Sequence, residues 1–153
     1  MSQDILVERL FESLVAGDRT AARRIVDETM SDGASAEQIV SDLFWPTYER
    51  VTRLFRADQL TTVAHHMATR LLRVLTDQAA LLFERKPSRG RTIFALCGPN
   101  DADELAAQMA VDLLEADGYE ISFAGGGVAN DEVLSQVQER RPDVLLLFAS
   151  APS

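Results

Sequence analysis

The spacing of apolar residues changes at a short basic segment, residues 85–91, which reads Arg-Lys-Pro-Ser-Arg-Gly-Arg. Before this segment, apolar residues recur every three or four positions, which is typical of helices with one buried face. After it, short apolar runs alternate with helix-like stretches, which is typical of a parallel sheet with helical crossovers. The sequence therefore predicts a helical cap domain over residues 1–84, a linker over 85–91 and a sheet domain over 92–153.

The cap domain is expected to be a bundle of four or five helices. Asp18 and Ser35 are placed to cap the helices that follow them, and Gln38 completes a capping-box pattern with Ser35. Pro46 lacks a backbone N–H, so we expect a break before it and place it in the first turn of a fourth helix. A last, long helix is expected over residues 61–83.

The second half predicts strands over residues 92–97, 119–123 and 143–148, with a helix between successive strands. This order indicates a flavodoxin-like, Rossmann-type parallel sheet. The predicted fold class is α + α/β, with a helical cap bundle followed by a sheet domain truncated after three strands. The third strand is the most apolar, and an open apolar edge invites pairing. We therefore expect either a longer natural domain or a second chain that covers this edge.

Composition argues against several classes of partner. The formal net charge of −9 disfavours direct binding to nucleic acid, because phosphate contacts need clustered cations. The single cysteine, Cys97, cannot form an internal disulfide and suits a reducing cytoplasm. The N-terminus does not read as a signal peptide, and no apolar run is long enough to span a bilayer. We expect a cytoplasmic protein without a nucleic acid or membrane partner.

The only two histidines, His65 and His66, follow two large aromatic residues, Trp45 and Phe55. Imidazole is the commonest metal ligand and aromatic rings pack on flat groups, so this pattern indicates a metal or a flat cofactor. Neighbouring residues on a helix point about 100° apart, so the two histidines cannot both face one ligand squarely. Either one packs in a helix interface and the other is solvated, or His66 faces a ligand. No nucleophile and base can be paired from these residues, so we do not predict an enzyme.

Five helical segments carry a family resemblance: LVAGD at 14–18, AARRIV at 21–26, GASAEQI at 33–39, PTYERV at 46–51 and LTTVA at 60–64. They resemble the helical cap of the cobalamin-binding domain family. Within that family the chain is most similar to cobalamin-dependent photoreceptor repressors and related stand-alone corrinoid proteins. The resemblance covers nearly the whole chain and implies that a cobalamin binds between the cap and the sheet domain.

The resemblance also implies residues for the upper face of the corrin ring. In the photoreceptor group, the cap carries a Trp, nine intervening residues and then Glu-His. Phe55 occupies the Trp position here, His65 the Glu position and His66 the His position. The expected upper-face residues are therefore Phe55, His65 and His66, with His66 as the candidate axial ligand to cobalt.

The lower face departs from the family pattern, which carries Asp-x-His-x-x-Gly after the first strand. In the family the His is the lower axial ligand and the Asp orients it. This chain has Asp101, Asp103 and Ala106 at those three positions. A carboxylate matches this cobalt role less well than imidazole. Both aspartates are also explained by a helix N-terminus, where Asp101 is expected to cap the helix and the dipole favours carboxylates. A corrinoid is therefore expected to bind without a lower His.

Two further places are expected near the ligand. Gly125 and Gly126 follow the second strand, at the edge where doubly wound sheets bind ligands. They form either a flexible turn or bare backbone facing a flat group. Ser150 stands where the family has a Ser-x-Leu motif.

The function expected from the resemblance is that of a non-enzymatic sensory or regulatory module. A bound corrinoid would bias the orientation of the domains and hence a partner or homo-oligomer interface. No DNA-binding segment is visible, so an effect on transcription or signalling would act through another protein. Three alternatives stay open: a cofactor-free module for protein interaction or dimerisation, a binder of haem or another tetrapyrrole, and a corrinoid carrier for a methyltransferase. The carrier fits least, because the usual lower-face support is missing.

Overall fold

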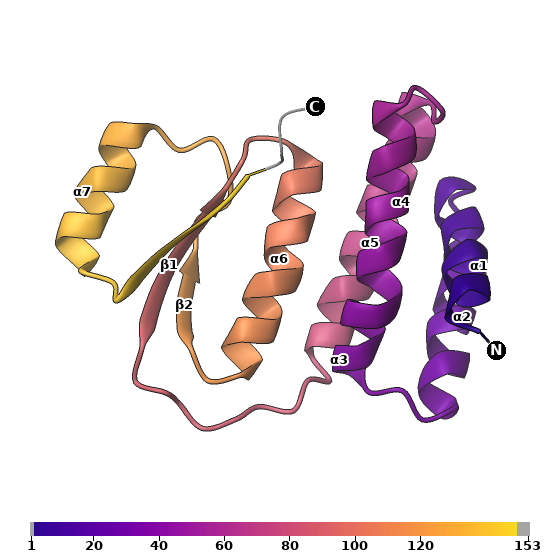
Figure 1. Ribbon diagram of the computed structural model, residues 1–153, viewed down its shortest axis with the longest axis horizontal. Helices are drawn as coiled ribbons and strands as arrows, with labels where there is room; N and C mark the ends of the chain where they lie inside the picture. The colour runs from indigo at the N-terminus through magenta and orange to yellow at the C-terminus, as the bar shows by residue number, and fades with distance from the viewer. Residues whose placement is uncertain (1, 150–153) are drawn as a thin grey trace. The chain divides into compact units, whose positions relative to one another are not determined.

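A computed structural model describes residues 2–149, which form two compact units, a helical unit ending at Phe83 and a sheet unit beginning at Glu84 (Figure 1). The helical unit contains α1 (Gln3–Val15), α2 (Arg19–Ser31), α3 (Ala36–Gln38), the π-helix η1 (Ile39–Phe44), α4 (Trp45–Arg56) and α5 (Thr62–Ala80). The sheet unit contains β1 (Thr92–Cys97), α6 (Asp101–Ala116), β2 (Glu120–Phe123), α7 (Asn130–Arg140) and β3 (Val144–Phe148). This order confirms the predicted fold class, a helical part followed by a parallel sheet with helices.

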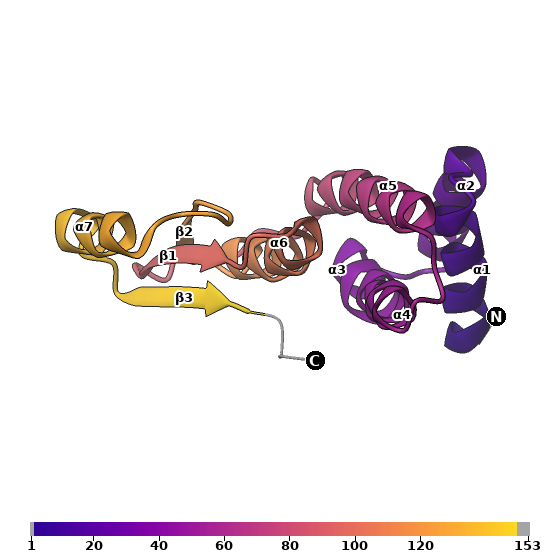
Figure 2. The same ribbon diagram turned by 90° about the horizontal axis from the view of Figure 1, so that it is seen from above.

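The helical unit is held together by the apolar stripe of α1, which contacts α2, α4 and α5 (Figure 2). Leu10 and Leu14 of α1 are fully buried, as is Phe44. The predicted caps are confirmed: the Asp18 carboxylate accepts a hydrogen bond from the Ala21 N–H at 3.0 Å, and α3 begins with the predicted capping box. The last helix ends at Ala80, three residues earlier than predicted.

Pro46 lies in the first turn of α4, as predicted, but the break expected before it is wrong, because α3, η1 and α4 follow one another without interruption. The π-helix accommodates the proline: the Trp45 N–H donates to the carbonyl of Val40, five residues back. In an α-helix the N–H of residue 46 would donate to the Asp42 carbonyl, but proline has none. That carbonyl instead accepts a hydrogen bond from the side chain of Gln3 in α1. A tertiary contact thus donates to the carbonyl to which the proline cannot donate.

The sheet has the strand order β2-β1-β3, and both strand pairs are parallel. Helices α6 and α7 lie on opposite faces (Figure 1). Alternate residues of β1 point towards α6, so Ile93 and Ala95 form a buried cluster with Val111 of that helix. The core of the sheet unit therefore lies between α6 and one face of the sheet.

The face beneath α7 is less completely covered. Phe94 lies under the guanidinium of Arg140, 5.6 Å from the ring centroid, and is buried. Leu145 and Leu147 share this face because they pair with Phe94 and Leu96, yet they are 41% and 64% exposed. Helix α7 itself has no buried residue. The apolar edge strand anticipated from the sequence is therefore β3. Over residues 2–149, no helix is both long and apolar enough to cross a membrane.

Candidate functional site

Two of the predicted upper-face residues form a stacked pair in the helical unit. The rings of Phe55 and His65 lie 3.9 Å apart between centroids, with 11° between their planes. The turn between α4 and α5 sets this geometry: Asp58 adopts a left-handed conformation with φ 56°, and the Thr61 hydroxyl caps α5 by accepting from the Ala64 N–H at 3.0 Å. The turn brings the last residues of α4 against the first turn of α5. His65 is only 8% exposed and Phe55 is half-buried, so the stack packs within the bundle.

His66 is exposed and its ring is tilted 49° to that of His65, with 6.0 Å between centroids. The pair thus separates as neighbouring positions on a helix require: one imidazole packs and the other meets solvent. An exposed neutral imidazole can donate a nitrogen lone pair to a metal carried by an external group. Trp45 takes no part in this arrangement, because it stacks on Tyr48 with 5.2 Å between centroids.

The start of α6 differs from its prediction. The residue that caps the helix is Asn100, whose side-chain oxygen accepts from the Asp103 N–H at 2.7 Å, rather than Asp101. Asp101 is exposed in the first turn, where the helix dipole stabilises a carboxylate. Its placement needs no ligand.

Asp103, at the position where the resemblance expects the lower His ligand, is only 7% exposed. Its carboxylate lies against the turn that follows β1: a Cβ added to Gly98 would lie 2.2 Å from Oδ2 of Asp103. The Gly98 N–H in turn donates to the carbonyl of Phe148 at 2.9 Å. The side chain of Asp103 is therefore packed into the loop between β1 and α6. Sequence reasoning missed Gly98, since a lone glycine after a strand carries no distinctive signal.

Gly125 and Gly126 pack against the same turn. The carbonyl of Gly125 accepts from the Cys97 N–H at 3.0 Å, which continues the contact with β1 beyond the end of β2. A Cβ on Gly126 would lie 2.2 Å from the backbone oxygen of Gly98. The Gly126 N–H donates to Glu104 at 3.4 Å. We predicted either a flexible turn or bare backbone facing a ligand. The glycines instead allow the loop after β2 to pack closely against the loop after β1.

The remaining sequence candidates add no metal-binding cluster. Ser150 lies outside the described residues. Within residues 2–149, no group of three or more His, Cys, Asp or Glu side chains could hold a metal ion. Two larger surface depressions, of about 690 Å³ over α2 and about 560 Å³ beside β2, are not lined by any predicted site residue. The candidate site is therefore defined by the predicted aromatic and histidine side chains and not by these surface depressions.

Residues 6–79 match a protein-family model described as "B12 binding domain". The helical unit belongs to the B12 binding domain family. The match spans α1 to α5 almost entirely and contains Phe55, His65 and His66. It confirms the family inferred from the sequence and supports the expected corrinoid ligand. A search of the curated proteins found no match to the chain.

Solved structures share the fold of the whole chain. The monomethylamine corrinoid protein of Methanosarcina barkeri aligns with a TM-score of 0.80 at 15% identity, over 97% of this chain and 71% of that one. The methanol:cobalamin methyltransferase complex of the same organism aligns with a TM-score of 0.55 at 18% identity, over 98% of this chain and 58% of that one. At these identities the likeness shows a common fold. The chain spans less than two thirds of the second structure's length.

The residues present fit a corrinoid on the helical side only. On the helical side, the Phe55–His65 stack is packed within the unit, and the neighbouring His66 presents an exposed imidazole ring. On the sheet side, Asp103 is a buried carboxylate packed against Gly98 and supplies no imidazole. The lower protein ligand that the resemblance would require is not provided by this residue.

Proposed function

We propose that this protein is a non-enzymatic corrinoid-binding module with a sensory or regulatory role. The observation that carries the proposal is the B12 binding domain match over residues 6–79, which includes the stacked Phe55–His65 pair and the exposed His66. Corrinoid binding is the general part of the proposal. The sensory or regulatory role is the specific part.

His66 is the proposed protein ligand. When bound, a corrinoid supplies a cobalt centre whose axial positions accept a nitrogen donor. His66 is solvent-exposed, so its ring can turn towards such a centre without breaking a packed contact. In the neighbouring stack, His65 is buried and Phe55 is half-buried, so the stack anchors the first turn of the helix that carries His66 against the end of α4. His65 and Phe55 are proposed to position the ligand rather than to bind cobalt.

A corrinoid is proposed to bind without a protein ligand on its lower face. The reason is the position of Asp103, whose carboxylate is directed at Gly98. Releasing it would expose a loop in which Gly98 and Gly126 already touch. A ligand held through one protein face can be gained or lost as its concentration changes, and such occupancy shifts a conformational equilibrium. This property suits a sensor.

The second candidate function is a corrinoid carrier for a methyltransferase. It is favoured by the fold shared with a corrinoid protein and with a methyltransferase complex. It is disfavoured by Asp103, because a carrier must support its cobalt through changes of oxidation state. A cofactor-free dimerisation unit and a binder of haem are the other candidates that the test separates.

The test is to incubate the full chain separately with hydroxo-, methyl- and adenosylcobalamin and with haemin, desalt it, and record visible spectra. We expect retained cobalamin, with a spectrum that changes in His66→Ala. The matched control is Arg70→Ala, one helical turn further along the same exposed face of α5, which should leave the spectrum unchanged. A protein that is colourless with every cobalamin overturns the corrinoid proposal, and retention of haemin alone assigns the site to haem.

The regulatory role needs a separate measurement. Light scattering of the loaded and unloaded protein should show a corrinoid-dependent change in assembly or shape. Retained cobalamin with no such change, together with methyl transfer when a corrinoid methyltransferase is added, would favour the carrier instead.

A further inference from the structure

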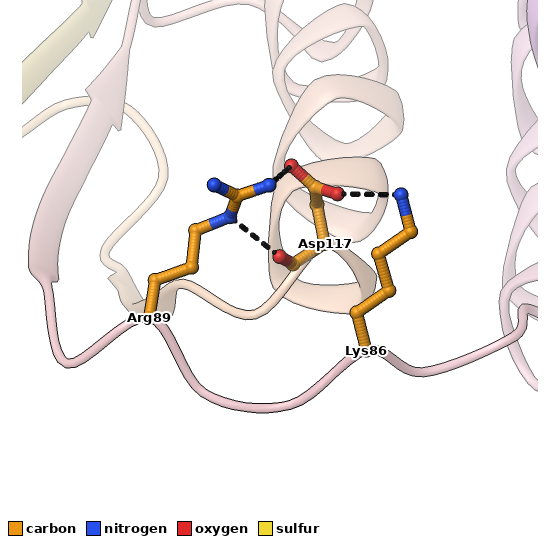
Figure 3. A network of polar contacts seen from close by, with 3 residues as sticks. All are labelled: Lys86, Arg89 and Asp117. Atoms are coloured by element: carbon orange, nitrogen blue, oxygen red, sulfur yellow. Dashed lines mark hydrogen bonds and ion pairs between the residues drawn. The ribbon is translucent and has the colours of Figure 1, made fainter.

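The stretch between the two units, predicted as a linker over residues 85–91, is bonded along the C-terminal end of α6 (Figure 3). The last residue of the helical unit, Phe83, is buried, at 6% exposed. From Arg85 onwards the chain makes contacts with the sheet unit, beginning with an ion pair to Glu115 at 2.9 Å. Only a short piece between Ala80, where α5 ends, and Arg85 precedes these contacts.

Backbone hydrogen bonds fix the path of this stretch. The Lys86 N–H donates to the Ala116 carbonyl at 2.8 Å, and the Arg89 N–H donates to the Gly118 carbonyl at 2.9 Å. Gly118 has φ 105°, and a Cβ there would lie 2.3 Å from the carbonyl oxygen of Pro87. The stretch therefore satisfies carbonyls at the end of α6 and approaches so closely that glycine is required.

Asp117 joins the side chains of this stretch (Figure 3). Its carboxylate lies 3.1 Å from Nζ of Lys86 and 2.9 Å from Nη2 of Arg89, while Nε of Arg89 donates to the Asp117 carbonyl at 2.8 Å. The Arg89 guanidinium also lies 5.2 Å from the centroid of the Tyr119 ring. Cations are favoured at the C-terminal end of a helix, where its dipole is negative. Lys86 and Arg89 are thus bound at one defined place, the C-terminal end of α6.

We propose that residues 85–89 form an ordered strap, held on the end of α6 by Asp117, which confines movement between the two units to the few residues around Glu84, between buried Phe83 and Arg85. A free linker of this composition would sample many paths and allow wide relative motion of the units. A strap shortens the mobile connection to a few residues and so reduces the range of orientations. This device does not depend on whether a corrinoid binds.

Trypsin cleavage of the full chain tests whether the strap is closed. Trypsin can cut after Arg85, Arg89 and Arg91, whereas Pro87 protects the bond after Lys86. Cleavage follows the population of the open strap, so Asp117→Ala should be cut after Arg89 about tenfold faster than the native protein. The control, Glu120→Gln, removes an exposed carboxylate from the start of β2 and should be cut at the native rate. Equal rates in the native protein and Asp117→Ala, with unchanged circular dichroism, would overturn the strap.

Distances between spin labels test whether the strap confines the units. Labels on cysteines introduced at Val63 and Leu134, both well exposed, report on one unit each in a Cys97→Ala background. We expect a broader distance distribution after Asp117→Ala than with native Asp117. Distributions of equal width, even with faster cleavage, would overturn the proposed confinement. The same comparison in the corrinoid-free protein keeps this result separate from the proposed function.

Discussion

Replacing Gly98 with alanine tests whether Asp103 is packed into the loop after β1. The new Cβ would lie 2.2 Å from Oδ2, 3.0 Å from Cγ and 3.5 Å from Cβ of Asp103. The first distance is far below van der Waals contact and the second is tight, whereas the third is an ordinary contact. The substitution therefore clashes with the carboxyl group of Asp103 and with no other part of that side chain.

The magnitude follows from this geometry. Forcing an extra carbon into a packed region costs about 1–3 kcal/mol, so Gly98→Ala should lower the free energy of unfolding by that amount. Asp103→Ala alone should lower the free energy of unfolding by about 1–3 kcal/mol, because the interactions of a buried carboxylate are removed. In the double variant the nearest remaining atom of residue 103 is the Cβ at 3.5 Å, so the clash is gone. The double variant should therefore lose about 1–2 kcal/mol less than the sum of the single losses.

Urea unfolding followed by far-UV circular dichroism measures these four free energies. Gly126→Ala is the matched control: its Cβ would meet the backbone oxygen of Gly98 at 2.2 Å, which Asp103→Ala cannot relieve. Gly126→Ala and Asp103→Ala should therefore add. If Gly98→Ala and Asp103→Ala also add to within about 0.5 kcal/mol, the carboxylate does not face Gly98 and the argument against a lower ligand fails.

Three other predictions follow from the described contacts. The hydrogen bond from Lys86 is the main cause that lowers the pKa of Asp117 below 3.8. The stability that the Asp117 carboxylate contributes is therefore fully present above pH 3.8 and is lost as the pH falls through its folded-state pKa. The difference in melting temperature between the native protein and Asp117→Asn should therefore shrink in acid, and a difference that grows would contradict this. His65→Ala should lower the free energy of unfolding by at least the roughly 0.5–1.5 kcal/mol of an aromatic pair, while His66→Ala should be close to neutral; urea midpoints in the reverse order would exclude the buried stack. Phe44→Ala should cost about 3–5 kcal/mol because its side chain is 0% exposed, whereas Val63→Ala at an exposed site should cost little, as chemical denaturation can measure.

Much of the fold was predictable because its signals are local. Asp18 and Ser35 cap helices through groups three residues away, so the residue types alone indicate where those helices begin. The alternation of apolar runs and helical stretches after residue 91 likewise predicted the parallel sheet. The candidate site was only partly predictable. The sequence singled out Phe55, His65 and His66, and the family match covers the segment that contains them.

By itself, the sequence determined the order of elements, the helix caps, the family resemblance and the replacement of the expected lower histidine by Asp103. Only the tertiary structure decided that His65 rather than His66 stacks on Phe55. It also decided that Asp103 faces Gly98 and that the basic stretch is bonded to the C-terminal end of α6. These features depend on atoms from different elements meeting at a few ångströms. A period along the chain indicates which face of an element is buried, but not which side chain from another element it will contact.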